Sequence, residues 1–419
     1  MEIVRRNILR YDRPHIAYSF LIFGFCVVSF LIVPFENYFG KKLFYISGYI
    51  SLFIFIIHFN FFIQNKSKII LPASILLAGT ISVLWVLFYK QQDDYINIYR
   101  QYQAAGKVQI SAAFIVAVAL NTRLPLQKYS TIVTIVTAVT MNAYAFYQSF
   151  FLNIDRVALN YDRATIAAYI LTLIDLLLMH SLLLSDLRNK ITFFLFAFIV
   201  TTSALILTGT RSAMIVYPVL VFILVLAIKK TLPRHHKIKL VTLLPVFLIL
   251  SGLIFNQKIT SRINDFRQNI IMMHEQEGEN SVISRMSMLI IAVKTGSEAL
   301  LGQSAGQRGE QARSIAQRHP FLYGALPYTT VHMHNELLET FSIKGIIGVL
   351  ALLALYISLL FNALVISYNP ALLVVTLALI IYGFSDVILF STEGTIMYCL
   401  SIIISLYMMK NSAGTRSIR

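Results

Sequence analysis

The residues best suited to chemistry lie in the short stretch His332-Met333-His334-Asn335-Glu336. Here a long polar stretch gives way to an apolar one, so two imidazoles and a carboxylate stand at the start of an expected helix. The dipole of a helix disfavours a charged histidine at its N-terminus, and a neutral imidazole can accept a proton. Asn335 is predicted to cap the helix, and Glu336 suits the positive end of its dipole. The position therefore predicts His334, or alternatively His332, as a general base.

A metal site is the second interpretation of these residues. His332 and His334 together with Glu336 could bind zinc. Two histidines four residues apart on one helical face are the strong spacing for zinc, whereas His-x-His at a helix start is weak. We therefore expect no metal at this site.

Arg211 is a candidate for binding an anion. It follows Gly209-Thr210 at the start of an apolar helix expected over about 213–228. The helix dipole disfavours a cation at this end, so an interfacial anchor explains Arg211 less well than a function does. A cation beside exposed helix N–H groups suits an anion such as a phosphate.

Arg285 is a second candidate, within an amphipathic helix expected over about 281–294. Helical spacing aligns it with Met288, Leu289 and Ala292, which places it on the apolar face of that helix. An arginine on such a face needs an anionic partner. That partner is either a structural one, Asp386 or a glutamate, or a substrate phosphate bound in a bidentate manner.

Other charged residues are expected to have supporting or structural roles. Asp386 falls inside an apolar span, where a carboxylate needs a cationic partner, and we expect it to order an active-site arginine. Lys107 and Arg163, near the outer ends of spans, add positive charge to the site. Arg308, like Arg313 and Arg318, is expected on a solvated helix face.

The composition indicates the elements that must position these residues. Of the 419 residues, 57% are hydrophobic and 13% charged, and the mean hydropathy is +0.72. A soluble protein carries about a quarter charged residues, so the chain is predicted to be an all-α integral membrane protein. We expect about twelve spans, over about 15–33, 43–62, 69–88, 104–120, 130–151, 164–184, 191–207, 213–228, 240–255, 343–364, 371–390 and 394–409.

The spans divide the chain into three parts. Residues 1–255 hold the first nine spans, 256–336 a long polar loop domain, and 337–419 the last three spans and a tail. Roughly eighteen basic residues fall on one side of the membrane and roughly seven in the short loops of the other, which predicts both termini in the cytoplasm. The long loop is then periplasmic. The net charge of +16 is explained by this bias and by contact of the 229–239 cluster with lipid headgroups, and no nucleic acid is expected.

Arginines and one base at the outer membrane boundary suit an anionic, lipid-anchored substrate with a phosphate leaving group. The sequence has no Walker-type phosphate loop and no Asp-x-Asp pair at this site. Nucleotide hydrolysis is therefore not predicted.

The ordered set of motifs resembles the bacterial lipopolysaccharide O-antigen ligase family, within the O-antigen ligase and polymerase superfamily. The layout of spans is similar along the whole chain. The recognisable residues are Thr208-Gly209-Thr210-Arg211-Ser212, Ser284-Arg285-Met286 in the long loop, His332-x-His334-Asn335-Glu336 at its end, and Gly383-x-Ser385-Asp386.

The resemblance implies a glycosyltransferase of the C-type fold in the bacterial inner membrane, working on the periplasmic side. Such an enzyme transfers O-antigen glycan from undecaprenyl diphosphate to a sugar hydroxyl of lipid A–core, with inversion and without metal or other cofactor. His334 would be the base, and Arg211 and Arg285 would hold the diphosphate. O-antigen polymerases and protein O-oligosaccharyltransferases remain alternatives with the same carrier, and a lipid-linked sugar transporter is an alternative of a different class.

Overall fold

The computed structural model describes residues 14–92, 94–122, 124–228, 232–275 and 281–409. Within these ranges the chain is helical and contains no strand, which confirms the predicted all-α class. The basic segments at both ends of the chain, and Lys229 and Lys230 of the basic cluster, lie outside the described residues. The structure therefore does not describe some of the basic residues from which the topology was predicted.

Among the described residues, eight helices are long and apolar enough to cross a membrane. They are α3 (Asn37–Ile57), α5 (Lys66–Tyr89), α6 (Ile96–Asn121), α7 (Gln127–Phe150), α8 (Ala164–Leu184), α9 (Lys190–Leu207), α11 (Arg234–Ile254) and α15 (Glu336–Phe361), which continues into the π-helical η2 (Asn362–Ile366). Shorter apolar helices are α2 (Ile16–Ile32), α10 (Arg211–Ala227), α16 (Pro370–Gly383) and α17 (Thr392–Tyr407). Each predicted span overlaps one of these helices, although those predicted over 43–62 and 371–390 extend past the ends of α3 and α16. The exact number that cross the membrane stays a prediction.

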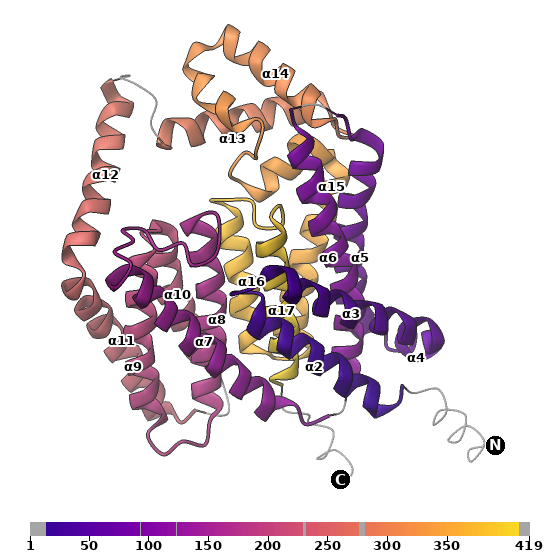
Figure 1. Ribbon diagram of the computed structural model, residues 1–419, viewed down its shortest axis with the longest axis vertical. Helices are drawn as coiled ribbons and strands as arrows, with labels where there is room; N and C mark the ends of the chain where they lie inside the picture. The colour runs from indigo at the N-terminus through magenta and orange to yellow at the C-terminus, as the bar shows by residue number, and fades with distance from the viewer. Residues whose placement is uncertain (1–13, 93, 123, 229–231, 276–280, 410–419) are drawn as a thin grey trace.

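The helices of the long polar loop form a head at one end of the molecule (Figure 1). The head contains α13 (Ser281–Glu298), α14 (Ala305–Arg318) and the 3-10 helix η1 (Pro320–Tyr328), while α12 (Asn256–Glu275) runs along the outer edge from α11. A separate small core, including Met288, Ile315 and Met333, holds the head together. A capping box, in which Ser304 and Gln307 exchange hydrogen bonds, starts α14.

Helix α8 is almost entirely buried, because it is apolar on every face and is packed against α7, α9, α10, α16 and α17. Its N-cap residue is Arg163. A buried central helix thus presents this arginine at the end that faces the head.

Helix α15 is broken at Gly345, which has φ +62°. A side chain there would collide with the carbonyl of Leu300. The connection between α13 and α14 pairs with the break instead: the amide of Ile346 donates to Leu300 O (2.9 Å) and the amide of Gln303 to Ile343 O (2.9 Å). The turns before the break therefore belong to the head, and the span predicted from 343 begins at the break.

Candidate active site

A cavity of roughly 480 Å³ opens between the head and the membrane helices. It is lined by Arg156, Ala158, Asp162, Arg163, Ala164, Thr165, Arg285, Met288, Tyr328, His334 and Asp386. These residues come from the loop before α8 and the first turn of α8, from α13, from the end of η1, and from the segments before α15 and after α16. Four residues that the sequence singled out, spread from Arg163 to Asp386, are therefore brought into one cavity.

His334 is held in an unusual backbone conformation at the edge of this cavity. Its φ is +46°, in the left-handed region that residues other than glycine rarely adopt. Asn335 caps α15 as predicted, with Oδ1 accepting from the amide of Leu338 at 3.0 Å, and its Nδ2 donates to Phe384 O at 3.2 Å. Strained backbone of this kind persists only where surrounding contacts enforce it and is frequent at functional sites.

Asp386 contacts histidines, which corrects the expectation that it orders an arginine inside a span. Helix α16 ends at Gly383, so Asp386 lies in the non-helical segment after it. Its Oδ1 is 3.2 Å from His334 Nδ1 and 3.6 Å from His332 Nε2. Burial alone would raise the pKa of Asp386, but its contact with His334, the neighbouring imidazole of His332 and the positive charge of Arg163 lower it below its usual value. The carboxylate is therefore ionised beside His334.

The His334–Asp386 contact is an ion-pair distance rather than a well-aligned hydrogen bond. His334 Nδ1 has no partner within hydrogen-bond geometry, although the two atoms are 3.2 Å apart. A small rotation of the imidazole is enough to align the N–H with the carboxylate.

His332 lies behind His334 and is fully buried. Its Nδ1 is 3.3 Å from the amide of His334, and its Nε2 is 3.2 Å from Arg163 Nη1. Burial lowers the pKa of His332 to about 4, an effect that Asp386 opposes and His334 reinforces. His332 is therefore neutral at physiological pH and has no access to the cavity, which favours His334 as the base.

A metal ion is the other ligand that these side chains could hold. One donor atom each from His332, His334 and Asp386 lies within 4.8 Å of the others. However, the Arg163 guanidinium is 3.2 Å from His332 Nε2, so a cation already lies beside the atom that would bind the metal. This arrangement fits a hydrogen-bonded cluster better than a metal centre, and the metal-free site stays a prediction.

Glu336 connects the first turn of α15 to the segment that carries Asp386. It is buried, and its Oε2 accepts hydrogen bonds from the amides of Ile388 (2.5 Å) and Leu389 (2.9 Å). Glu336 therefore supports the site by holding the backbone of the Asp386 segment.

Arg285 is exposed in the cavity, although the sequence pattern predicted it on a packed apolar face. Met288, one turn later, lines the same cavity and also packs in the core of the head, so Arg285 lies where this helix face passes from the core to the cavity. Within the described part of the chain Arg285 forms no ion pair. Its charge is therefore available to an anionic ligand.

Further arginines lie near Arg285, and two of them, Arg156 and Arg262, were not predicted as site residues from the sequence. Arg156 lines the cavity and its Nε donates to Thr208 O at 3.2 Å. Burial and the nearby charges of Arg262, Arg211 and Arg285 lower the pKa of Arg156. Only the presence of two arginines in the loop before α8 could have drawn attention to Arg156.

Arg262 of α12 lies over the turn that precedes Arg211. A Cβ at Gly209, where φ is +63°, would lie 2.9 Å from Arg262 Nη2. The glycine thus lets this guanidinium approach the start of α10, while Asp265 pairs with it at 3.1 Å. Arg211 does not line the cavity, but it belongs to this arginine cluster.

Two other predicted positions lie elsewhere. Lys107 is exposed in the middle of α6 and does not line the cavity. Arg308 is fully buried, so its assignment to a solvated face is wrong. Its partner is Glu339, at 2.7 Å.

Comparisons with known proteins show what the chain is similar to. A family model described as O-antigen ligase matches residues 196–353, which include Arg211, Arg285 and His334. The chain is also 28% identical over 396 residues to the O-antigen ligase of Escherichia coli (strain K12), and the match covers 93% of each protein.

Proposed function

We propose that the chain, which is similar to proteins of the O-antigen ligase family, transfers O-antigen glycan from undecaprenyl diphosphate to a sugar hydroxyl of lipid A–core. The observation that carries this proposal is the cavity that joins the His334–Asp386 pair to several arginines. Such a transfer needs a base for the acceptor hydroxyl and cationic side chains that bind the diphosphate.

The donor diphosphate binds at the arginines. Arg285 has no counter-ion among the described residues, and Arg156 lies in the same cavity, with Arg211 nearby in the cluster. Guanidinium groups bind phosphate oxygens in a bidentate manner and stabilise the negative charge that grows on the leaving group. The lipid diphosphate is already an activated donor, so the transfer requires neither ATP nor a metal ion.

His334 accepts the proton of the acceptor hydroxyl. With Nδ1 facing Asp386 at 3.2 Å, its Nε2 is left for the hydroxyl. The oxygen attacks the anomeric carbon from the side opposite the diphosphate, the carbon–oxygen bond to the phosphate breaks, and undecaprenyl diphosphate leaves with the electron pair. The ionised Asp386 stabilises the imidazolium that forms, and the sugar is inverted.

The membrane arrangement follows from the same proposal. The enzyme lies in the bacterial inner membrane, with both termini in the cytoplasm and the head and cavity in the periplasm. There the cavity can reach both lipid-anchored substrates.

The test is a lipopolysaccharide gel from a ligase-deleted strain with matching core, comparing the parent with His334→Ala at equal membrane level. We expect the long-chain ladder with the parent and its loss with the variant. Longer lipid-linked polymer without a ladder would instead assign the protein as a polymerase, and glycosylated protein as an oligosaccharyltransferase. A full ladder with His334→Ala would remove His334 from the mechanism.

A further inference from the structure

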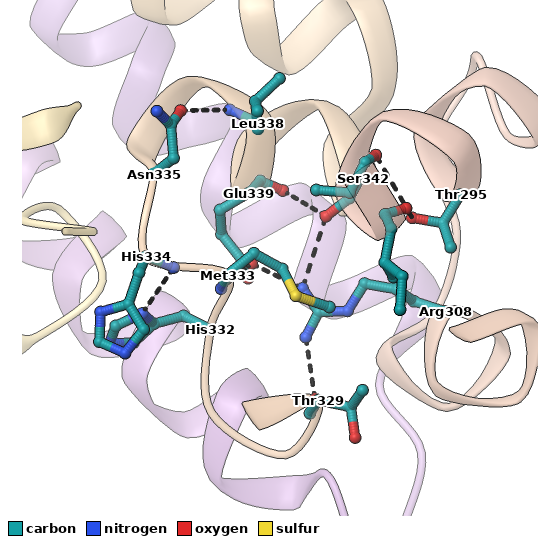
Figure 2. A network of polar contacts seen from close by, with 12 residues as sticks. Thr295, Arg308, Thr329, His332, Met333, His334, Asn335, Leu338, Glu339 and Ser342 are labelled. Atoms are coloured by element: carbon teal, nitrogen blue, oxygen red, sulfur yellow. Dashed lines mark hydrogen bonds and ion pairs between the residues drawn. The ribbon is translucent and has the colours of Figure 1, made fainter. Parts of the chain in front are cut away.

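A buried ion pair lies directly behind the loop of residues 330–334, which carries His332 and His334. Arg308 of α14 and Glu339 of α15 are both fully buried, with Nη1 and Oε2 2.7 Å apart. Figure 2 shows this pair beside the chain that carries His332, Met333 and His334. Neither side chain lines the cavity.

The pair also binds the backbone at two points, one before His332 and one between His332 and His334. Arg308 Nη2 donates to Thr329 O at 3.0 Å, and Glu339 Oε2 accepts from the amide of Met333 at 2.9 Å. Thr329 precedes the loop, and Met333 immediately precedes His334. The ion pair therefore anchors the loop at the point where the backbone turns into the left-handed conformation of His334.

The first turn of α15 holds both members of the His334–Asp386 pair. Glu339 accepts from the amide of Met333, just before His334, while Glu336, three residues earlier, accepts from the amides of Ile388 and Leu389 after Asp386. Two buried carboxylates on one rigid turn thus set the relative position of the imidazole and its partner carboxylate.

Stability alone does not account for a pair of this kind. Replacing a buried ion pair with apolar side chains of similar volume is often neutral or stabilising, whereas removing one partner is strongly destabilising. What apolar side chains cannot supply is the two hydrogen bonds to the loop backbone.

We propose that Arg308 and Glu339 are positioning residues, which set the His334–Asp386 geometry for transfer and link it to the packing of α14 on α15. This inference rests on the proposed function. Because Arg156, Arg211 and Arg285 lie on other elements, loss of the pair is expected to slow the chemical step and to leave donor binding intact.

The test uses purified full-length protein, a defined undecaprenyl-diphosphate-linked glycan and lipid A–core. The main variant replaces both residues, Arg308→Met with Glu339→Met, so that no unpaired charge remains buried. Misplacing a catalytic group by about 1 Å costs roughly 100-fold in rate. We expect kcat to fall on that order, while KM for the donor stays within about twofold.

Two further variants separate positioning from general structure. Arg308→Lys keeps a charge for Glu339 but loses the fork that reaches Thr329 O, so its kcat is expected between those of the parent and the double variant. Glu310→Gln, on the exposed side of the same helix, is the matched control and should behave as the parent.

The outcomes are distinct. A folded double variant with parental kcat, or one that loses kcat and donor affinity equally, overturns the inference while the proposed function stands. If the double variant does not fold, parental kcat in Arg308→Lys overturns it. A parent protein that transfers no glycan to lipid A–core overturns the proposed function itself.

Discussion

Arg285 and Arg308 lie on neighbouring helices of the head and have opposite surroundings. Arg285 is exposed in the cavity and forms no ion pair with the described residues, whereas Arg308 is fully buried against Glu339 at 2.7 Å. The sequence pattern predicted Arg308 on a solvated face. It predicted Arg285 on an apolar face, with either a structural carboxylate or a substrate phosphate as its partner. The helix face predicted from the sequence therefore does not decide whether an arginine binds a ligand or stabilises the fold. The difference is whether the protein itself supplies the counter-ion.

The largest effect is expected on stability, when the buried arginine is removed. Arg308→Met leaves the Glu339 carboxylate buried without its partner, so we expect a loss of about 3–5 kcal/mol in the free energy of unfolding. Arg285→Met removes an exposed charge and should stay within about 0.5 kcal/mol of the parent. Thermal unfolding in detergent measures both, and equal melting temperatures would contradict the comparison.

The next effect is on transfer, when the cavity arginine is removed. Arg285→Met loses charge-assisted hydrogen bonds to the diphosphate, so kcat/KM for the donor should fall about 100-fold. Arg285→Lys retains the charge without the fork and should lose less. Steady-state kinetics at varied donor concentration checks this series, and parental kinetics in Arg285→Met would remove this residue from donor binding.

Burial also affects a histidine: because the imidazole of His332 is buried, the stability of the protein is predicted to depend on pH. The folded pKa of His332 is about 4, below its ordinary value of 6.5. Between these values the unfolded chain binds a proton that the folded chain does not, so stability falls as the pH drops. The loss is about 2 kcal/mol from pH 6.5 to pH 5.

Melting temperatures across this range, compared with those of His332→Gln, isolate the contribution of His332. We expect the variant to show the shallower dependence on pH. Identical slopes in the two proteins would show that His332 is not buried in its neutral form.

The smallest effect is expected from chelation. Arginines supply the positive charge in the proposed site, so EDTA should leave the transfer rate of the purified protein unchanged. Loss of transfer on chelation, with recovery on adding a divalent metal, would instead assign His332, His334 and Asp386 as ligands.

Much of this arrangement could be predicted from the sequence. Runs of about 20 apolar residues located the membrane helices, because a buried or lipid-facing helix needs an apolar surface along its whole length. His334 and Arg285 were identified from their places at a helix start and on a helix face. The structure brings both to the cavity.

The contacts between distant segments could not be predicted in this way. Asp386 meets His334 because α16 ends at Gly383 and the following segment turns back to α15, where Glu336 holds it. Helix periodicity describes the face of one helix only. It therefore could not show that Glu339 would meet Arg308.

The most direct test of the central claim is a product balance with the purified protein in liposomes. The parent, given undecaprenyl-diphosphate-linked glycan and lipid A–core, should release one undecaprenyl diphosphate for each glycan joined to the core. His334→Ala should do neither while it melts at the parental temperature. Transfer at the parental rate by His334→Ala, or growth of the glycan on its carrier without transfer, would contradict the account.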